Sequence, residues 1–193
     1  MNRIFYIFSL LLICTVPLSS ETKVKSIIEG NIDTKIEIIV YESLTCGHCA
    51  SFHKEIYPNL KKDFIDKGLV KIEFRNFPLD LAAFNASKIA HCRNNGKSDI
   101  LHFLFENQEK WANVETVDQA NTNLKKIIKN NYPDLDFEKC INDKLIEDHV
   151  LEDRINAVKK FKVNATPTLI INEKKFDNPL DYEKLKKTLK KMI

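Results

Sequence analysis

The sequence has little net charge. Its 30 Lys and Arg residues nearly balance its 27 Asp and Glu residues, which leaves a formal charge of +3 at pH 7 over 193 residues. Proteins that bind the phosphate groups of nucleic acids carry clustered basic residues. Most of the lysines in this sequence are scattered. The lysine run near the C-terminus is most simply the solvent-exposed face of a helix. We therefore expect no nucleic-acid partner.

Long hydrophobic runs, internal repeats and low-complexity tracts are also missing. The apolar stretch 4–16 is shorter than the roughly 20 residues that span a bilayer. Arg3 before it and Pro17-Leu18-Ser19-Ser20 after it are typical of a secretory signal peptide, so we expect residues 1–20 to be removed on export. The alternatives are an uncleaved membrane anchor and a lipoprotein modified at Cys14, although no small residue precedes that cysteine.

The composition gives no sign of a disordered chain. Hydrophobic residues make up 44% of the sequence and charged residues 30%, which are ordinary values for a globular protein. A chain of this length can bury one well-packed core. We expect residues 21–193 to form a single domain that folds by itself.

Cysteine is rare, but two of the five cysteines form the motif Cys46-Gly47-His48-Cys49 between a β-branched stretch, 36–41, and an amphipathic helix. A helix that begins at Cys46 points unpaired N–H groups and its positive dipole end at that sulfur, which favours the thiolate. Cys49 lies one turn further on and can attack a mixed disulfide on Cys46. His48 can donate a hydrogen bond or carry positive charge beside the thiolate. The pattern predicts a redox pair, with half of a zinc knuckle as the alternative.

The residues after the motif predict a helix and a second strand. The helix carries a single apolar stripe that would face a core, and Pro58 predicts a kink in it. Gly68 ends the helix, and 69–74 forms the second strand. A strand–helix–strand order predicts parallel strands with a right-handed crossover. The stripe consists of Cys49, Phe52, Ile56, Leu60 and Phe64.

From about 79 to 161 the pattern changes to helices with almost no strand signal, which indicates an inserted helical subdomain. After it, 168–171 is a short apolar strand, 172–174 a turn, and 179–192 an amphipathic helix that would cover the sheet. A short edge strand near Ile27 precedes all of these elements. The expected helices of the insertion are 82–91, 98–110, 117–130, 137–146 and 149–161.

Two motifs, Leu44-Thr45-Cys46-Gly47-His48-Cys49 and Ala165-Thr166-Pro167-Thr168, together resemble those of the bacterial DsbA-like thiol–disulfide oxidoreductases. The resemblance covers nearly the whole mature chain. It implies an α/β thioredoxin-like fold over 21–193, with an inserted all-helical subdomain at about 79–161.

By this resemblance, Pro167 is cis and packs beside the redox pair, and Thr166 faces Cys46. A Thr-Pro bond adopts cis at low cost, and the backbone of Thr166 and Ala165 would then pair with a substrate peptide as an added strand. The alternative is a trans proline in a turn before an edge strand.

One position departs from the family pattern. Many DsbA-like proteins carry a buried acid six residues before the first cysteine, where it assists proton transfer. This chain has Val40 at that position, and Glu42 lies nearby on the turn after the strand. Whether Glu42 takes over this role is open at the level of the sequence.

Cys92 and Cys140 fall on different expected helices of the insertion. In an exported protein two such cysteines indicate a structural disulfide, and some DsbA-like proteins have a second pair in this subdomain. The alternatives are two buried free thiols, or a zinc site shared with Cys46 and Cys49.

The resemblance implies a periplasmic enzyme that donates the disulfide of Cys46 and Cys49 to unfolded or newly translocated proteins that contain cysteine. Cys46 is the expected nucleophile and Cys49 the resolving thiol, and we expect no metal or cofactor. A membrane protein of the DsbB type would reoxidise the pair, and the enzyme would be a monomer. A reductase or isomerase on the same fold is one alternative, and a metal-binding or metallochaperone module is another.

Four further histidines are scattered over the expected helices. We interpret them as surface or packing residues rather than as metal ligands. They are His53, His91, His102 and His149.

Overall fold

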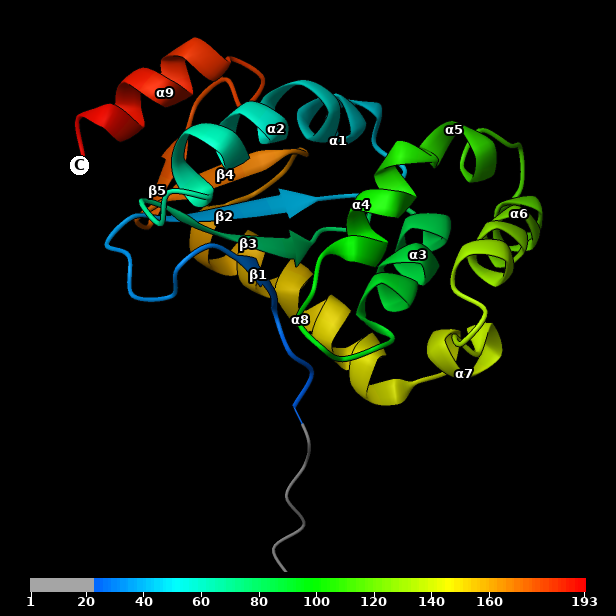
Figure 1. The fold of residues 1–193 in the computed structure, drawn as a ribbon. Helices are drawn as coiled ribbons and strands as arrows, with labels where there is room; N and C mark the ends of the chain where they lie inside the picture. The colour runs from blue at the N-terminus through cyan, green and yellow to red at the C-terminus, as the bar shows by residue number, and fades with distance from the viewer. Residues whose placement is uncertain (1–22) are drawn as a thin grey trace, which may run out of the picture.

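One mixed sheet of five strands is the centre of the structure, a computed structural model that describes residues 23–193. The strands lie in the order β1-β3-β2-β4-β5 (Figure 1). The expected signal peptide, residues 1–20 with Cys14, lies outside the described residues. The strands are β1 (Ile27–Glu29), β2 (Glu37–Glu42), β3 (Lys71–Asn76), β4 (Thr168–Ile171) and β5 (Lys174–Phe176).

β2 is the central strand, and it is buried on both faces of the sheet. It pairs in parallel with β3 and antiparallel with β4, so the parallel arrangement predicted from the strand–helix–strand order is confirmed. Ile38 and Val40 belong to the main core, whereas Ile39 and Tyr41 belong to a smaller cluster on the other face. A strand covered on both faces has a continuous apolar sequence, as this one does.

The helical segment after β2 consists of four pieces that follow one another directly. Pro58 stands in the first turn of the third piece and has no backbone N–H to continue the α-helical hydrogen bonds. A wider π-helical turn lies directly before it. All five residues of the predicted apolar stripe are buried, as predicted. The pieces are α1 (Gly47–Ser51), η1 (Phe52–Ile56), α2 (Tyr57–Leu60) and η2 (Lys61–Ile65).

Five helices gather beyond the carboxyl end of β2 (Figure 1). Asp80, Thr116 and Asp136 begin three of them, each accepting a hydrogen bond from a backbone N–H of the first turn. Most of the buried hydrophobic residues of these helices join the main core of the sheet. The helices are α3 (Leu81–His91), α4 (Asp99–Glu106), α5 (Gln108–Trp111), α6 (Val117–Asn131) and α7 (Phe137–Ile141).

Two helix boundaries differ from those predicted. The predicted helix 98–110 is divided at Asn107 into α4 and α5. The predicted gap at 147–148 is helical, and α8 (Lys144–Phe161) begins instead directly after Asp143. The Asp143 carboxylate accepts hydrogen bonds from two backbone N–H groups of the first turn, at 2.9 and 3.2 Å, which stabilises this start.

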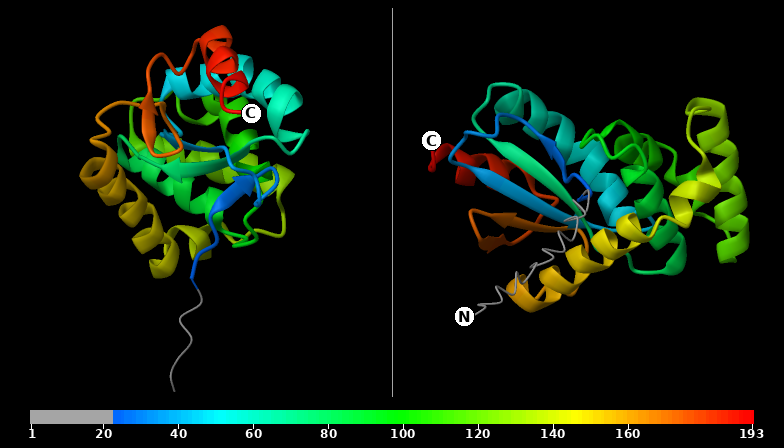
Figure 2. Two further views of the ribbon diagram at one scale, coloured as in Figure 1. Left: turned by 90° about the vertical axis from the view of Figure 1, so that its left-hand side faces the viewer. Right: turned by 90° about the horizontal axis from the view of Figure 1, so that it is seen from below.

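α8 runs back along the second face of the sheet (Figure 2). Its Ala157 packs with Ile39, Tyr41 and Ile170, so helices cover both faces.

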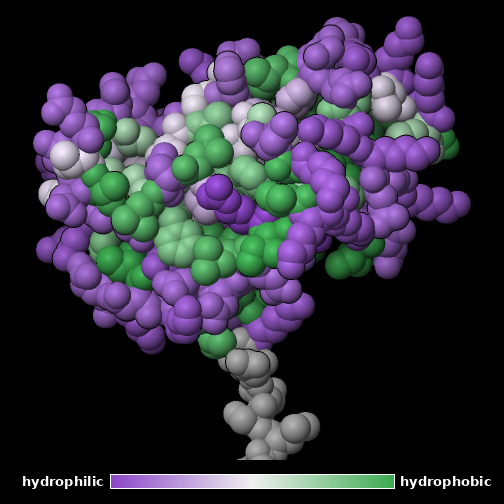
Figure 3. All heavy atoms as spheres, turned by 180° about the vertical axis from the view of Figure 1, so that it is seen from behind, coloured by the Kyte–Doolittle hydropathy of each residue, from purple (hydrophilic) through white to green (hydrophobic). Residues whose placement is uncertain are grey.

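No helix in the range 23–193 combines the length and hydrophobicity needed to cross a membrane. Figure 3 shows hydrophobic residues exposed among hydrophilic ones on the side of the molecule where α8 lies. The exposed large hydrophobic residues of α8 include Leu151, Ile155 and Val158.

The C-terminal segment follows the sequence prediction closely. β4 has the predicted bounds, and the turn after it contains Asn172 and Glu173, whose φ angles of 43° and 68° are positive. The short polar strand β5 was not predicted, because two of its three residues are lysines. The last helix, α9 (Tyr182–Lys190), begins after its cap Asp181, and it packs two leucines into the main core.

A disulfide joins Cys92, which follows α3, to Cys140 of α7, with their Cα atoms 5.3 Å apart. It connects two helices of the subdomain that are separated by 48 positions in the sequence. Such a cross-link restricts the unfolded chain, which raises the free energy of unfolding.

We predict that replacing both cysteines by alanine (Cys92→Ala, Cys140→Ala) lowers the free energy of unfolding by up to about 4 kcal/mol, the loop-closure contribution for a loop of this length. Urea unfolding without reductant measures this loss. In excess reductant neither protein has the cross-link, so both should unfold at the same urea concentration. A difference that persists in reductant would mean that packing, and not the disulfide, provides the stability.

Candidate active site

The turn after β2 places Cys46 at the start of α1. The residue is the N-cap, one position before the predicted start of the helix, and its backbone is extended with φ −80° and ψ 120°. Its carbonyl accepts the N–H groups of Cys49 and Ala50, both at 3.1 Å. The sulfur therefore lies at the end of the helix where unpaired N–H groups and the dipole favour negative charge.

The two cysteines of the motif differ sharply in their access to solvent. Cys46 is half-buried, whereas the side chain of Cys49 is completely buried in the core. Both are free thiols in this structure. A reagent or a substrate thiol can therefore reach the Cys46 sulfur but not the Cys49 sulfur.

The same two positions shift the thiol pKa values in opposite directions. The hydrogen bond from Cys49, against the opposing effect of burial, lowers the pKa of Cys46 to about 5, with smaller contributions from Thr166 and from the N–H groups of Cys49 and His48. Burial raises the pKa of Cys49 far above the ordinary value, and the bond to Cys46 and the charge of Glu42 raise it further. At neutral pH the reduced pair is a Cys46 thiolate beside a Cys49 thiol.

The loop before β4 lies against Cys46. The peptide bond between Thr166 and Pro167 is cis, and the Thr166 carbonyl oxygen is 3.4 Å from the Cys46 sulfur. The Thr168 hydroxyl donates a 2.7 Å hydrogen bond to the Ala165 carbonyl, which closes the loop. Ala165 is exposed at its tip. The structure thus brings the two sequence motifs together.

His48 is exposed on the first turn of α1. Its backbone N–H, rather than its imidazole, is among the groups that lower the pKa of Cys46.

The helical subdomain holds the turn before the motif in place. The Gln108 side chain on α5 donates to the carbonyl oxygens of Leu44 and Cys46, at 2.8 and 3.1 Å. The Thr45 hydroxyl donates a 2.6 Å bond to the carboxylate of Asp80, the cap of α3. Sequence reasoning missed Gln108, because nothing in its local pattern indicates contact with a turn 62 positions away.

A buried acid is present near Cys49, two residues after the position where the family pattern places one. Val40 is packed in the core, and Glu42, on the same side of β2 by strand alternation, is only 4% exposed. Its Oε2 atom lies 2.7 Å from Nε2 of His53. Its Oε1 atom is buried without a hydrogen-bond partner among the described residues.

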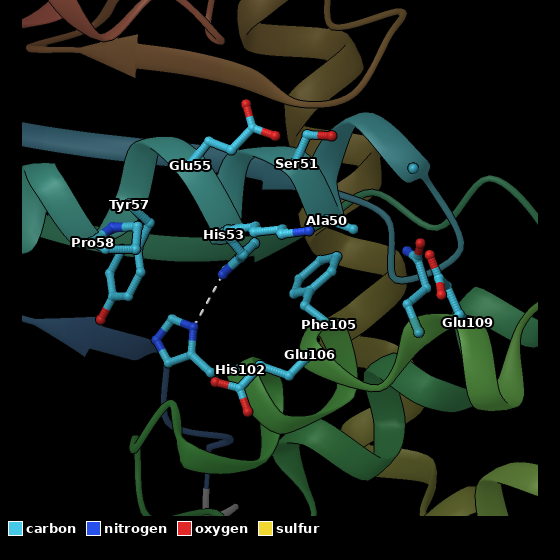
Figure 4. Close-up of a pocket in the computed structure, with 13 residues that line it drawn as sticks. Ala50, Ser51, His53, Glu55, Tyr57, Pro58, His102, Phe105, Glu106 and Glu109 are labelled. Atoms are coloured by element: carbon cyan, nitrogen blue, oxygen red, sulfur yellow. Dashed lines mark hydrogen bonds between the residues drawn. The ribbon is translucent and has the colours of Figure 1, made fainter.

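His53 in turn contacts His102 of α4, and the two rings point toward one another across the space between the helices (Figure 4). The Nδ1 atoms are 3.0 Å apart, and Nε2 of His102 lies 2.7 Å from Oε1 of Glu29 in β1. Both rings pack against aromatic side chains, in line with their interpretation as packing residues, and they also contact carboxylates, which the sequence did not indicate. Their partners are far away in the sequence, so no spacing pattern could have revealed the contacts.

The histidine contact borders a pocket of about 680 Å³ between the helix after Cys46 and α4. Its wall combines aromatic, aliphatic and polar side chains (Figure 4). Between residues 23 and 193, no group of three or more His, Cys, Asp or Glu side chains could hold a metal ion. The lining includes Gly47, His53, Pro58, His102, Phe105 and Gln108.

Known proteins of similar sequence carry names from disulfide chemistry. A putative protein-disulfide oxidoreductase of Rickettsia bellii is 27% identical over 151 residues, covering 77% of this chain and 58% of that protein. Disulfide bond formation protein D of Bacillus subtilis is 27% identical over 177 residues, covering 85% of this chain and 75% of that protein. The chain therefore spans little more than half the length of its Rickettsia relatives.

Solved structures of similar fold cover nearly the whole chain. Wolbachia pipientis alpha-DsbA1 has a TM-score of 0.75 and 26% identity, with 92% of each chain covered. BdbD from Bacillus subtilis has a TM-score of 0.71 and 24% identity, with 86% of this chain and 91% of that chain covered. The second likeness supports the fold alone.

A sequence model described as thioredoxin matches residues 22–191, nearly all of the described chain. Together with the paired cysteines, the loop that contacts them and the helical subdomain, this match shows that the chain belongs to the thioredoxin family, among its DsbA-like members.

Proposed function

We propose that this chain is a thiol–disulfide oxidoreductase that works as an oxidase, with Cys46 as the nucleophile and Cys49 as the resolving thiol. The asymmetry of the pair carries the proposal. Cys46 is accessible and its pKa is lowered to about 5, whereas Cys49 is buried and its pKa is raised. A substrate can therefore attack only the Cys46 sulfur, and only the Cys49 sulfur needs a proton when it leaves.

The reaction moves two electrons from a substrate dithiol to the enzyme. A substrate thiolate attacks the Cys46 sulfur of the oxidised pair, the bond between the two enzyme sulfurs breaks, and Cys49 leaves and takes up a proton. The second substrate thiolate then attacks the substrate sulfur of the mixed disulfide. Cys46 leaves as a stable thiolate, and the substrate departs with its new disulfide.

The direction of the reaction follows from the Cys46 pKa. Groups that stabilise the thiolate stabilise the reduced enzyme, which makes the disulfide form the better oxidant. DsbA itself is the standard example of this relation, so what we propose is its application to this chain. The hydrogen bond from Cys49 and the N–H groups at the start of α1 are the contributing groups here.

The loop before β4 is proposed to bind substrate. Thr166 lies beside the Cys46 sulfur and Ala165 is exposed, so a substrate peptide can pair with their backbone as an added strand while its cysteine reaches Cys46. Pro167 is buried beneath this loop and supports it through the cis bond that follows Thr166, and His48 is exposed on the first turn of α1.

We further propose that the protein acts after export, in the periplasm, on unfolded or newly translocated proteins that contain cysteine. The apolar segment 4–16 is typical of a signal peptide, and a disulfide between Cys92 and Cys140 fits an oxidising compartment. A membrane protein of the DsbB type would take the electrons from the reduced pair.

Two assays separate the oxidase from a reductase, an isomerase or a metal-binding module. The oxidised protein should introduce disulfides into reduced, unfolded ribonuclease A in stoichiometric amounts, and it should reduce insulin only slowly. The reverse ranking of the two rates would favour a reductase or isomerase. Absence of both activities, with tightly bound metal in the purified protein, would favour the metal-binding module.

The second prediction concerns the Cys46 thiolate. Its absorbance near 240 nm should appear with a midpoint near pH 5 in the reduced protein, and the transition should be missing in Cys46→Ser. Because the bond from Cys49 is the largest cause of the low pKa, Cys49→Ala should move the midpoint to higher pH. A wild-type midpoint near 9.0, the ordinary value of a cysteine, would contradict the proposed direction.

The third prediction concerns the stability of the two redox forms. The Cys46 pKa falls from an ordinary 9.0 to about 5 on folding, so between these pH values the unfolded reduced chain binds one more proton than the native one. The free energy of unfolding of the reduced form, relative to the oxidised form, should therefore rise from pH 5 to pH 9 and be lost as the pH falls through 5. Urea unfolding of both forms across this range measures the difference. A difference independent of pH would refute it.

A further inference from the structure

Four polar side chains form a continuous chain of contacts that starts at Glu42, whose charge raises the pKa of the buried Cys49. The order is Glu42, His53, His102 and Glu29, and the successive distances are 2.7, 3.0 and 2.7 Å. Each distance is that of a hydrogen bond. The four residues come from β2, η1, α4 and β1, so the chain crosses the core from the sheet to the pocket in Figure 4.

These four side chains together carry one proton more than two ionised carboxylates and two neutral imidazoles would carry. Three hydrogen bonds need three protons, one in each contact. Two ionised carboxylates and two neutral imidazoles supply only two, so the complete chain holds an extra proton. At the far end Glu29 is ionised: burial raises the pKa of its carboxyl, but hydrogen bonds from His102, Ser98 and Tyr57 outweigh this and hold it near 2. The mobile proton is therefore shared among the other three groups.

Cys49 is the group in this region that exchanges a proton during the reaction. Its side chain has no exposed surface, so the proton that it takes up on reduction has no direct access to water. Glu42 lies on the side of β2 that faces Cys49, and the charge of its carboxylate acts on that thiol. The unpartnered Oε1 atom of Glu42 is available to pass a proton to the sulfur.

We propose that His53 and His102 form a proton relay between Glu42, which serves Cys49, and the pocket beside them. This inference rests on the proposed thiol–disulfide exchange, but it holds for either direction of that reaction. Both rings line the pocket, which is the source and sink of the proton. The relay adds two positioning and proton-transfer residues that the sequence motif does not contain.

The steps of the relay conserve charge and atoms. When a substrate thiolate attacks Cys46, the electron pair of the broken S–S bond goes to the Cys49 sulfur, which takes a proton from Glu42. Glu42 passes on the proton that it receives from Nε2 of His53, so Glu42 remains a carboxylate, and His53 becomes neutral while its Nδ1 atom stays bonded to His102. The chain is then one proton short, so one of its contacts has two acceptors facing each other until water in the pocket supplies a proton. Reoxidation of the pair reverses each step.

The rings are held in the geometry that such a relay requires. His53 stacks on Phe105, with ring centroids 4.0 Å apart and planes 17° apart, and His102 stacks on Tyr57 at 4.4 Å and 26°. Stacking leaves the ring nitrogens free to face the next member of the chain. Rotation of either ring would break two of the three contacts.

The fourth prediction tests the relay with His53→Gln and His102→Ala. The rate at which a small dithiol reduces the oxidised enzyme should fall by about tenfold or more in both variants, because a proton donor of this kind contributes at least that much. Alkylation of the Cys46 thiolate by iodoacetamide transfers no proton to or from Cys49, so its rate should not change. Stopped-flow fluorescence and mass spectrometry measure the two rates.

A matched control comes from the other buried histidine. His91 is 3% exposed and its Nε2 lies 2.9 Å from the Asn76 amide, away from this chain of contacts. His91→Gln should therefore lose packing comparable to that lost in His53→Gln while keeping the wild-type rate of reduction. A second test is chemical rescue: imidazole should restore the rate of His102→Ala, and N-methylimidazole, which has only one nitrogen free to bond, should not.

The outcomes separate the relay from the proposed function. A decrease of less than about tenfold in both variants, or an equal decrease in reduction and alkylation, would overturn the relay. If His53→Gln does not fold, His102→Ala with its rescue decides alone, because that ring is at the edge of the pocket. Failure of the proposed function shows differently: the wild-type enzyme itself would then not exchange disulfides with the dithiol.

Discussion

The register of β2 in the sheet determines where every group of the site lies. Tyr41 in β2 is paired with Thr168 in β4, so the segments that leave this pair carry Cys46 and Thr166 toward each other. These residues are 120 positions apart in the sequence, yet their sulfur and carbonyl oxygen are 3.4 Å apart. A slip of one residue would turn Glu42 to the face of the sheet that α8 covers and would move the start of α1. The burial of β2 on both faces prevents such a slip. The packing of the core therefore also fixes the positions of the site residues.

A spacing of three residues is sufficient to give two identical side chains opposite chemistry. Desolvation raises the pKa of both thiols. At Cys46 it is outweighed by the hydrogen bond from Cys49 and, to a smaller extent, by the backbone N–H groups at the N-cap position. One turn later Cys49 points into the core. There its thiol donates a hydrogen bond to Cys46, and the charge of the Glu42 carboxylate raises its pKa. The helix start therefore favours a thiolate, and the helix interior favours a neutral thiol.

The sequence predicted the elements whose signal is local. The apolar run of β2, the stripe from Cys49 to Phe64 and the strand 168–171 all follow from side-chain periodicity over a few residues. The predicted start of α8 at 149 is wrong, because the capping side chain of Asp143 starts the helix earlier than the apolar pattern indicates. Contacts between distant segments left no local trace, so neither the bonds of Gln108 to the turn nor the pairing of His53 with His102 could be predicted. The sequence therefore predicts the cysteine motif of the site, but it does not predict the side chains from distant segments that contact the motif.

The buried polar groups reduce the stability of the fold, and most of those without a partner lie near the redox pair. A buried polar atom without a partner costs roughly 1–3 kcal/mol, and apolar residues of similar volume in place of a buried ionic group are often at least as stable. Three buried side-chain atoms lack a partner in the described part of the chain: Oε1 of Glu42, the hydroxyl of Thr166 and Nε of Arg75. Two of these three belong to residues that influence the redox pair. Unsatisfied groups in a core of Ile, Val and Phe are expected where the missing partner arrives during the reaction. For Thr166 the proposed partner is a substrate, and for Glu42 it is the proton that Cys49 would gain and lose in the proposed relay.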